Sequence, residues 1–524
     1  MSIQPNKMRR LALSLSFSVG LLSLSQEILW VRLLAFGQQG RPQAFAIVLT
    51  AFLLGISAGA IVGRRICASS PNLLASAARV LCWAAALDLI ALQLMAPLLG
   101  NEPWRMAGLV LMIALTAGAK GVLFPIVHHL GSSEAEAGLG RSVSHVYLAN
   151  VMGSALGPLI TGFWLLDVLR VESVWALVVG ATALLACLTL AAAAQRRASW
   201  FLMPVLLLGV GAVLTWQPLA VIDKVAEPAQ GDVPLTHLIQ NKHGILHVAG
   251  RNGDGGDITY GGNAYDGRIN VDMGRNSNML DRAYLMAVLH KAPRRVLVIG
   301  LSTGAWTEAI LGFPGVEQVD VVEINPGYRE LISRYPDVAP LLSDPRVHVH
   351  IDDGRRWLRS HPQARYDLIF QNTTFHWRAY TSLLLSREYL TELRRHLAPG
   401  GIAAMNTTDS LDAYATAMSV FGHVVRYSNF AYMSDVPLQR RPDAEAVLRA
   451  CLTGGRPSFA DALFARPAVA WRLLNTPLVP AAEHLRSSPL TEPGVITDLN
   501  MLNEYRHGQA PLFGALQFML PPNR

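Results

Sequence analysis

The chain has 524 residues, of which 51% are hydrophobic and 15% charged, and its formal net charge is +7. Its apolar residues are concentrated in 11–217, whereas 218–524 have the polarity of ordinary globular domains. No basic stripe with interleaved aromatic residues occurs, so we expect no nucleic-acid partner; arginines near membrane ends explain the charge better. The 4 cysteines show no paired spacing, so we predict neither disulfides nor a metal site.

Apolar runs fill the N-terminal part of the chain, and most reach the ~20 residues that a helix needs to span a bilayer. They cover residues 11–34, 44–63, 77–99, 106–130, 145–166, 172–194 and 199–216. Gly55, Gly59 and Gly63 stand at a spacing that favours close helix packing. We predict a multi-pass α-helical membrane domain of about seven helices over 1–217. Its expected partner is the lipid bilayer of a bacterial-type inner membrane.

Five ionisable residues lie inside these runs: Glu27, Arg32, Asp88, Lys120 and His128. Charges at such depth are costly and often mark a ligand site or a pathway. One interpretation is structural, with Glu27 pairing Arg32 near an interface and Lys120 extending its amine to the membrane surface. The other is a substrate site that opens into the membrane.

The rest of the chain alternates between strand-like and helix-like segments. Short strands joined by Gly, Asn and Asp turns predict a β-rich segment over 218–290. Five strands, each followed by a helix, then predict a mostly parallel sheet and a Rossmann-like domain over 291–436. These strands are expected at 295–300, 317–323, 346–351, 366–371 and 400–406. Residues 437–524 are expected to form a C-terminal helical extension.

Three elements at the ends of the first three strands predict a nucleotide site. Gly300 and Gly304 permit a tight turn where backbone amides approach a ligand, although a plain strand–helix turn explains this spacing equally well. Glu323 ends the second strand, where an acid accepts hydrogen bonds from ribose hydroxyls. Asp352 and Asp353 end the third, where a carboxylate can hold an adenine amino group. Taken singly, each acid could equally be a helix N-cap or a turn residue.

Several longer motifs resemble the spermidine synthase (polyamine aminopropyltransferase) family. In the soluble half these are AYDGRIN, AYLMAVLHKAPRRVLVIG, VVEINP, DPRVHVHIDDGRRWL, YDLIF and LLSREYLTELRRHLAPGGI. The motifs QEILWVRLLAFG, AFLLGISAGA, YLANVMGSALGPL and ITDLNMLNEY are similar to the membrane-fused branch of that family. The resemblance implies a class I methyltransferase/spermidine synthase-like fold. It also implies a sulfonium nucleotide substrate and release of methylthioadenosine.

The resemblance also assigns roles by motif position. It implies that Glu323 holds the ribose and that Asp353 holds the adenine, with Asp352 beside it. Asn270 falls where the family has a glutamine near the donor, and Tyr284 matches a tyrosine at the mouth of the active site.

Two positions depart from the family pattern. Thr303 stands where the first glycine loop of the family carries an aspartate that binds the donor's amine. Asn372 replaces the aspartate that helps to deprotonate the acceptor amine, and an amide cannot act as a general base. Ordinary spermidine synthesis is therefore in doubt.

The altered segment QNTTFHWRAY offers other chemistry. Asn372 and Thr373 exchange neutral hydrogen bonds, His376 is a candidate base, and Arg378 is a candidate clamp for a carboxylate. An arginine in place of acids fits S-adenosylmethionine, which keeps its carboxylate, better than the decarboxylated form. The alternative is that Arg378 is simply a surface charge.

These observations favour an integral membrane transferase of the aminopropyltransferase type. The donor would be S-adenosylmethionine or its decarboxylated form, and no metal would be needed. One alternative is a lyase in which the donor's own carboxylate attacks its γ-carbon, giving methylthioadenosine and homoserine lactone. A methyltransferase and a non-catalytic nucleotide sensor or transporter remain as further alternatives. The sequence is also compatible with a homo-oligomer.

The orientation in the membrane presents a conflict. Basic residues are more numerous at one set of helix ends (Lys7, Arg9, Arg10, Arg64, Arg65, Arg141, Arg196, Arg197) than at the other (Arg41, Arg105, Arg170). The positive-inside rule then places the N-terminus in the cytoplasm and, after seven spans, the C-terminal domain outside. Adenosyl nucleotides are made in the cytoplasm. Either one of the seven runs is re-entrant, or the nucleotide has an unusual route of supply; we expect a cytoplasmic catalytic domain.

Overall fold

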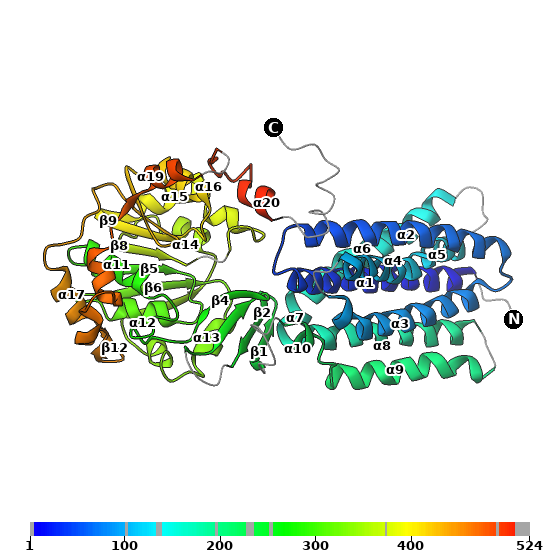
Figure 1. Ribbon diagram of the computed structural model, residues 1–524. Helices are drawn as coiled ribbons and strands as arrows, with labels where there is room; N and C mark the ends of the chain where they lie inside the picture. Colours follow the sequence, from blue (N-terminus) through cyan, green and yellow to red (C-terminus); the bar gives the residue numbers. More distant parts are fainter. Residues whose placement is uncertain are drawn as a thin grey trace.

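The computed structural model describes residues 5–99, 103–132, 139–193, 197–226, 235–250, 255–372, 375–488 and 492–508. The N-terminal part forms a helical bundle, and the remainder forms an α/β domain that lies at one end of the bundle (Figure 1).

Among its described residues, the bundle contains seven helical segments that are long and apolar enough to cross a membrane. Its helices are α1 (Pro5–Gly37), α2 (Gln43–Ser69), α3 (Leu73–Leu98), α4 (Pro103–Gly121), α5 (Leu123–Gly131), α6 (Leu139–Ile160), η1 (Thr161–Leu165), α7 (Leu166–Val168), α8 (Val171–Ala192), α9 (Ser199–Trp216) and the short α10 (Val221–Val225). The helix α1 begins at the end remote from the α/β domain and ends beside that domain (Figure 1).

Glycines allow α2 and α4 to pack backbone against backbone. A Cβ atom added at Gly55 would lie 2.2 Å from the carbonyl oxygen of Ala114, and one at Gly59 would lie 2.1 Å from that of Gly118. No side chain fits at such distances. The predicted small-residue packing is therefore present in the second helix.

The ionisable residues of the bundle are arranged differently from the structural interpretation of the sequence. Lys120 does not extend to the surface, because its amine forms a buried ion pair of 2.6 Å with Asp88, which also accepts a 2.5 Å hydrogen bond from Gln26. Arg32 donates to the backbone carbonyls of Asn241 and Lys242 in the α/β domain rather than pairing with Glu27. Asp88, Lys120 and Arg32 thus each have polar partners, as expected for charges in apolar surroundings.

The α/β domain begins with a small antiparallel sheet. It consists of β1 (Leu235–Asn241), β2 (Gly244–Ala249), β3 (Ile258–Gly261) and β4 (Ala264–Arg268), in that spatial order. This sheet lies between the bundle and the larger sheet (Figure 1).

The larger sheet has the strand order β14-β10-β11-β9-β8-β5-β6-β7. Its strands are β5 (Arg295–Ile299), β6 (Gln318–Glu323), β7 (Val347–Ile351), β8 (Tyr366–Gln371), β9 (Leu397–Asn406), β10 (His423–Tyr427), β11 (Phe430–Ser434) and β14 (Val479–Pro480). The five strands from β9 to β7 are parallel, as predicted, whereas β11 runs antiparallel to both of its neighbours. The result is a Rossmann-like, doubly wound sheet.

Helices cover both faces of this sheet because its parallel strands are apolar on both sides. They are α11 (Asp281–Leu289), α12 (Ala305–Leu311), α13 (Gly327–Ile332), α14 (Gly354–Ser360), α15 (Arg387–Arg395) and α16 (Leu411–Met418). The extension adds β12 (Leu452–Thr453), β13 (Arg456–Pro457), α17 (Ala444–Ala450), α18 (Val469–Asn475), α19 (Ala481–Ser487) and α20 (Leu502–His507).

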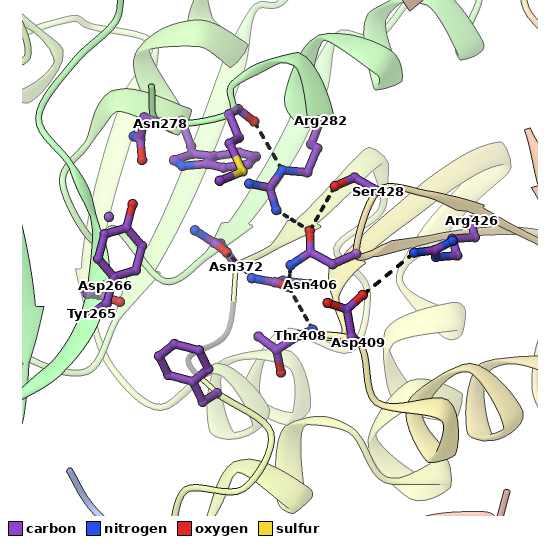
Figure 2. Close-up of a pocket in the computed structure, with 15 residues that line it drawn as sticks. Tyr265, Asp266, Asn278, Arg282, Asn372, Asn406, Thr408, Asp409, Arg426 and Ser428 are labelled. Atoms are coloured by element: carbon purple, nitrogen blue, oxygen red, sulfur yellow. Dashed lines mark hydrogen bonds and ion pairs between the residues drawn. The ribbon is translucent and has the colours of Figure 1, made fainter. Parts of the chain in front are cut away.

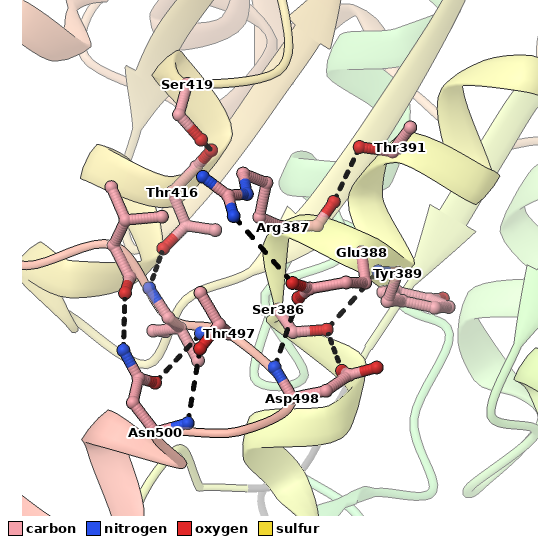
Figure 3. Close-up of polar contacts among 12 residues, drawn as sticks. Ser386, Arg387, Glu388, Tyr389, Thr391, Thr416, Ser419, Thr497, Asp498 and Asn500 are labelled. Carbon is pink, nitrogen blue, oxygen red and sulfur yellow. Dashed lines mark hydrogen bonds and ion pairs between the residues drawn. The ribbon is translucent and has the colours of Figure 1, made fainter.

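The C-terminal segment is attached to three of these helices by polar contacts, and Figure 3 shows those to α15 and α16. Asp498 forms a bidentate pair with Arg355 of α14, at 2.7 and 2.8 Å, and accepts a 2.6 Å hydrogen bond from Ser386 at the start of α15. The amide of Ile496 donates to Thr416 of α16. These contacts attach the motif near the C-terminus to the helix that follows β7.

Candidate active site

Two neighbouring cavities lie at the carboxyl ends of the parallel strands. The strand order reverses between β5 and β8, where open α/β sheets bind ligands. The glycine-loop cavity, about 220 Å³, is lined by the turn after β5 and by acids after β6 and β7. The asparagine cavity, about 390 Å³, contains Asn278, Asn372, Asn406 and Asn429 in its wall (Figure 2). Asp266 and Asn372 line both cavities.

The turn after β5 has the conformation that its glycines permit. Gly300 and Gly304 have φ angles of 92° and 76°, in the left-handed region. A Cβ atom at Gly304 would lie 2.8 Å from Leu341, so this position excludes side chains on two grounds. Gly300 lines the glycine-loop cavity, and Gly304 allows α12 to start directly behind it.

Glu323 is the acid at the end of β6, and its carboxylate is held in place by backbone amides. One oxygen accepts a hydrogen bond from Leu301 and the other from Asn325, both at 2.8 Å. The side chain lines the glycine-loop cavity although the residue is 4% exposed. Burial raises the pKa of Glu323 to about 7, against the opposing effect of these amides.

The two aspartates after β7 line the same cavity. Asp353 is the N-cap of α14 and accepts a 2.9 Å hydrogen bond from the amide of Arg356. Asp352 pairs with the Arg356 side chain. Asp353 therefore both caps α14 and lines the glycine-loop cavity.

Asp266, in the AYDGRIN motif, is a site residue that the sequence analysis did not single out. It accepts a 2.5 Å hydrogen bond from the hydroxyl of Tyr328, and its backbone carbonyl accepts one from Ser302. Burial raises the pKa of the Asp266 carboxyl, and the hydrogen bond from Tyr328 opposes that shift. Its place in a motif was the signal that could have identified it.

Arg378 lines the glycine-loop cavity from the loop after β8. Burial lowers the pKa of its guanidinium, and the nearby Tyr328 and Asp266 oppose that shift. The guanidinium lies close to Gly40 and Gly262, since Cβ atoms added there would lie 2.8 and 2.6 Å from it. The nearby carboxylate of Asp266 partly balances the positive charge of Arg378.

Asn372 and His376 have different positions relative to the cavities. Asn372 accepts a 3.0 Å hydrogen bond from Asn406 at the junction. His376 lines neither cavity but contacts Thr408, which lines the asparagine cavity, through its Nδ1 atom at 2.7 Å. Burial lowers the pKa of His376 to about 4, so the ring is neutral near pH 7. Thr373 lies outside the described residues.

Tyr284 is not at the mouth of the site, contrary to the expectation from the resemblance. Its side chain is fully buried, its hydroxyl contacts Ser458 and Thr453 at 2.9 and 3.0 Å, and it lines neither cavity. The orientation of α11 directs this side chain toward the C-terminal extension instead.

Asn270 and Thr303 also lie outside both cavity walls. Asn270 closes a local turn by accepting from the amide of Asp272 at 2.7 Å and donating to Ser277 at 2.8 Å. Thr303 is 1% exposed, and its neighbour Ser302 lines the glycine-loop cavity instead. Ser302 has a φ of 46°, in the left-handed region.

Other cavity residues had no local signal in the sequence. Arg282, Trp306, Asn406 and Asn429 come from four separate segments that only the fold brings together. Among the described residues, no group of three or more His, Cys, Asp or Glu side chains is arranged to hold a metal ion.

Comparison with known proteins agrees with the fold. Residues 280–424 match the family described as the spermine/spermidine synthase domain. The chain is 34% identical over 149 residues to polyamine aminopropyltransferase 2 of Streptomyces coelicolor, covering 27% of this chain and 26% of that protein. It is 36% identical over 118 residues to the polyamine aminopropyltransferase of Streptococcus pneumoniae, covering 22% and 40%.

A spermidine synthase structure from Thermotoga maritima shares 18% identity, with a TM-score of 0.34 over 40% of this chain and 82% of the other. Within the C-terminal part of this chain, residues 280–424 match a spermidine synthase domain, as the motifs there indicate. The N-terminal bundle is consistent with a fused branch of that family. The chain spans less than half the length of the two aminopropyltransferases that it matches.

Proposed function

We propose that the protein is a membrane-bound transferase of the aminopropyltransferase type. The observation that carries this proposal is the junction of the two cavities at Asp266 and Asn372, beside the buried carboxylate of Glu323. One cavity would hold the adenosyl part of a sulfonium nucleotide, either S-adenosylmethionine or its decarboxylated form. The other would hold the acceptor, and the two substrates would meet at the junction.

The reaction is a displacement at carbon. A lone pair of the acceptor attacks the carbon attached to the sulfonium, and the C–S bond breaks with its electron pair returning to sulfur. The products are the alkylated acceptor and neutral methylthioadenosine. An amine acceptor also loses one proton, which must pass to a base. Holding both substrates in line supplies much of the rate enhancement.

The residues of the glycine-loop cavity suit the adenosyl group. The ionised carboxylate of Glu323 can accept hydrogen bonds from two ribose hydroxyls. Asp353 and Asp352 offer acceptors to the adenine amino group, and the turn at Gly300 leaves room for a close approach of the ligand.

Asp266 is the residue we assign to proton removal. Its raised pKa makes it a better proton acceptor at neutral pH than an ordinary carboxylate, and it lines both cavities. Asn372, at the other side of the junction, cannot take this role.

The proposed location is a membrane, with the catalytic domain in the cytoplasm where adenosyl nucleotides are made. Among the described residues, seven helical segments are long and apolar enough to span, by the criterion of length and composition. With all seven spanning, a cytoplasmic catalytic domain requires the start of α1 to lie outside, against the bias of basic residues; with one of them re-entrant, the start of α1 lies in the cytoplasm as well. A reporter fused after residue 508 tests this placement, since an external reporter would separate the site from its nucleotide.

The function itself is tested by incubating the detergent-purified protein with each sulfonium nucleotide and a panel of amines. We expect acceptor-dependent formation of methylthioadenosine, measured by chromatography, and its loss in Glu323→Gln. Asp281→Asn serves as a matched control, because Asp281 is a buried acid outside both cavity walls. If the wild-type protein showed no turnover and did not bind methylthioadenosine, the proposal would be refuted.

A further inference from the structure

The wall of the asparagine cavity contains a buried cation that forms no ion pair with a carboxylate of the described residues. Arg282 is 7% exposed, and its guanidinium lies 5.3 Å from the ring centroid of Trp306 and 5.1 Å from that of Phe430. Its hydrogen bonds go to the backbone carbonyl of Met279 and to the side-chain oxygen of Asn429, both neutral acceptors (Figure 2). Within the described residues, Arg282 forms no ion pair.

The nearest acid in sequence, Asp281, raises the pKa of Arg282 through its charge, against the larger effect of burial, but forms no ion pair with it among the described residues. The two carboxylate oxygens of Asp281 accept hydrogen bonds from Asn276, at 2.7 Å, and from the hydroxyl of Tyr427, at 2.9 Å. Burial lowers the pKa of Arg282, the direction expected for a desolvated cation. Buried charges are normally paired, so an unpaired arginine in a cavity wall is suited to an anion supplied by a ligand.

A chain of amides connects this arginine to the junction of the cavities. Arg282 donates to Oδ1 of Asn429, Nδ2 of Asn429 donates to Oδ1 of Asn406 at 2.9 Å, and Nδ2 of Asn406 donates to Oδ1 of Asn372 at 3.0 Å. The backbone N–H of Thr408 also donates to Oδ1 of Asn406, at 2.9 Å.

The direction of this chain follows from two groups that can only donate. A guanidinium has no acceptor, and neither has a backbone N–H, so the oxygens of Asn429 and Asn406 must face Arg282 and Thr408. The oxygen of Asn372 must then face Asn406, which leaves its NH₂ group turned away into the cavity (Figure 2). Asn372 therefore presents a hydrogen-bond donor at the junction, whereas the carboxylate of Asp266 is the acceptor that lines the same junction.

We propose that Arg282 and Asn372 form a subsite for a carboxylate group of the substrate. This inference rests on the proposed function and specifies its substrate class. An ammonium group has no acceptor at Asn372 and would face the charge of Arg282, whereas a carboxylate is complementary to both. The carboxylate belongs either to the donor, as in S-adenosylmethionine, or to an acceptor that is an amino acid rather than a diamine.

Calorimetry on the full-length protein in detergent tests the subsite. One arm compares S-adenosylmethionine with its decarboxylated form. The second arm is measured with methylthioadenosine bound and compares amino-carboxylates with diamines of equal length. One pair is 3-aminopropanoate and 1,3-diaminopropane. The other is 4-aminobutanoate and 1,4-diaminobutane. We expect a preference of roughly 10- to 100-fold for the carboxylate in one arm, the usual effect of a hydrogen-bonded charge. A preference in the first arm assigns the carboxylate to the donor, and one in the second assigns it to the acceptor.

Variants distinguish the loss of the carboxylate subsite from a loss of folding. Asn372→Asp is nearly isosteric and turns the donor at the junction into an anion, so we expect it to abolish or reverse the preference. Arg282→Gln should abolish it as well, if the variant folds. Arg426→Gln is the matched control, because Arg426 lines the same cavity but already faces Asp409 at 3.9 Å. This control should change the preference less than about two-fold.

Equal binding of both members of each pair, or tighter binding of the amines by the wild-type protein, would overturn the carboxylate subsite. An Asn372→Asp variant that keeps the wild-type preference would do the same. In each of these cases, binding of methylthioadenosine that depends on Glu323 would leave the proposed function standing. If the wild-type protein did not bind methylthioadenosine at all, both the carboxylate subsite and the proposed function would be refuted.

Discussion

The backbone N–H of Ala379 donates a hydrogen bond of 2.8 Å to the carbonyl oxygen of Gly40. Gly40 lies between α1 and α2, and Ala379 belongs to the loop that brings Arg378 to the glycine-loop cavity. The guanidinium of Arg41 also lies 4.7 Å from the ring centroid of Trp377. The helical bundle is therefore part of the structure that supports the site.

The substitution Gly40→Ala tests this support. The new Cβ atom would lie 2.8 Å from Nε of Arg378, so the arginine must move. We expect the affinity for methylthioadenosine to fall several-fold, measured by calorimetry. Gly400→Ala is the control, because Gly400 has a similar φ of 75° and nothing within 4 Å of an added Cβ. Both variants should lose about 1–2 kcal/mol of stability from the left-handed backbone, and only Gly40→Ala should weaken binding.

Glu323 predicts the pH dependence of nucleotide binding. Its pKa of about 7 means that the carboxyl is mostly protonated at pH 6 and mostly ionised at pH 8. Ribose hydroxyls donate to the ionised form, so the affinity for methylthioadenosine should rise about ten-fold over this interval. Asp266 also raises the pKa of Glu323, so Asp266→Asn should shift the midpoint to lower pH. The Glu323→Gln profile should be flat, and a rise that persists in this variant would assign the titration to another group.

The buried pair of Asp88 and Lys120 predicts a non-additive effect on stability. Lys120→Met leaves the carboxylate of Asp88 without its cation, and breaking a buried pair costs about 3–5 kcal/mol. Adding Asp88→Asn removes the charge that was left unpaired. The double variant should therefore be more stable than Lys120→Met alone, as measured by thermal unfolding in detergent. Additive losses would show that the pair has no coupling energy.

Asp498→Asn tests the attachment of the C-terminal segment to α14. The substitution removes the charge that forms the bidentate pair with Arg355, and we expect a loss of roughly 1–3 kcal/mol of unfolding free energy. Asp461→Asn is the control, because Asp461 pairs with Arg449 while its side chain is 95% exposed, so its loss should stay below about 1 kcal/mol. Arg355 and the hydrogen bond from Ser386 also lower the pKa of Asp498, so its contribution is present near pH 7 and is lost as the pH falls. Equal losses in both variants would contradict a special role for the segment.

The sequence by itself determined the architecture and half of the site. Apolar runs of membrane length and alternating strand and helix segments are local patterns, and each corresponds to an element of the structure. The glycine turn at Gly300 and the acids Glu323, Asp352 and Asp353 end consecutive parallel strands, so their shared cavity follows from the topology of the sheet. The hairpin of β10 and β11 was not predicted, because its turn at Ser428 and Asn429 lacks the glycine that marks such turns.

Only the tertiary structure decided the other half. The direction in which Tyr284 points depends on how α11 packs, and no local pattern specifies that Ser302 rather than Thr303 lines the cavity. The pairing of Lys120 with Asp88 joins two helices whose contact no local pattern specifies. The same holds for Arg282 and the chain of asparagines, since hydrogen-bond direction at Asn372 is set by residues that lie far away in the sequence.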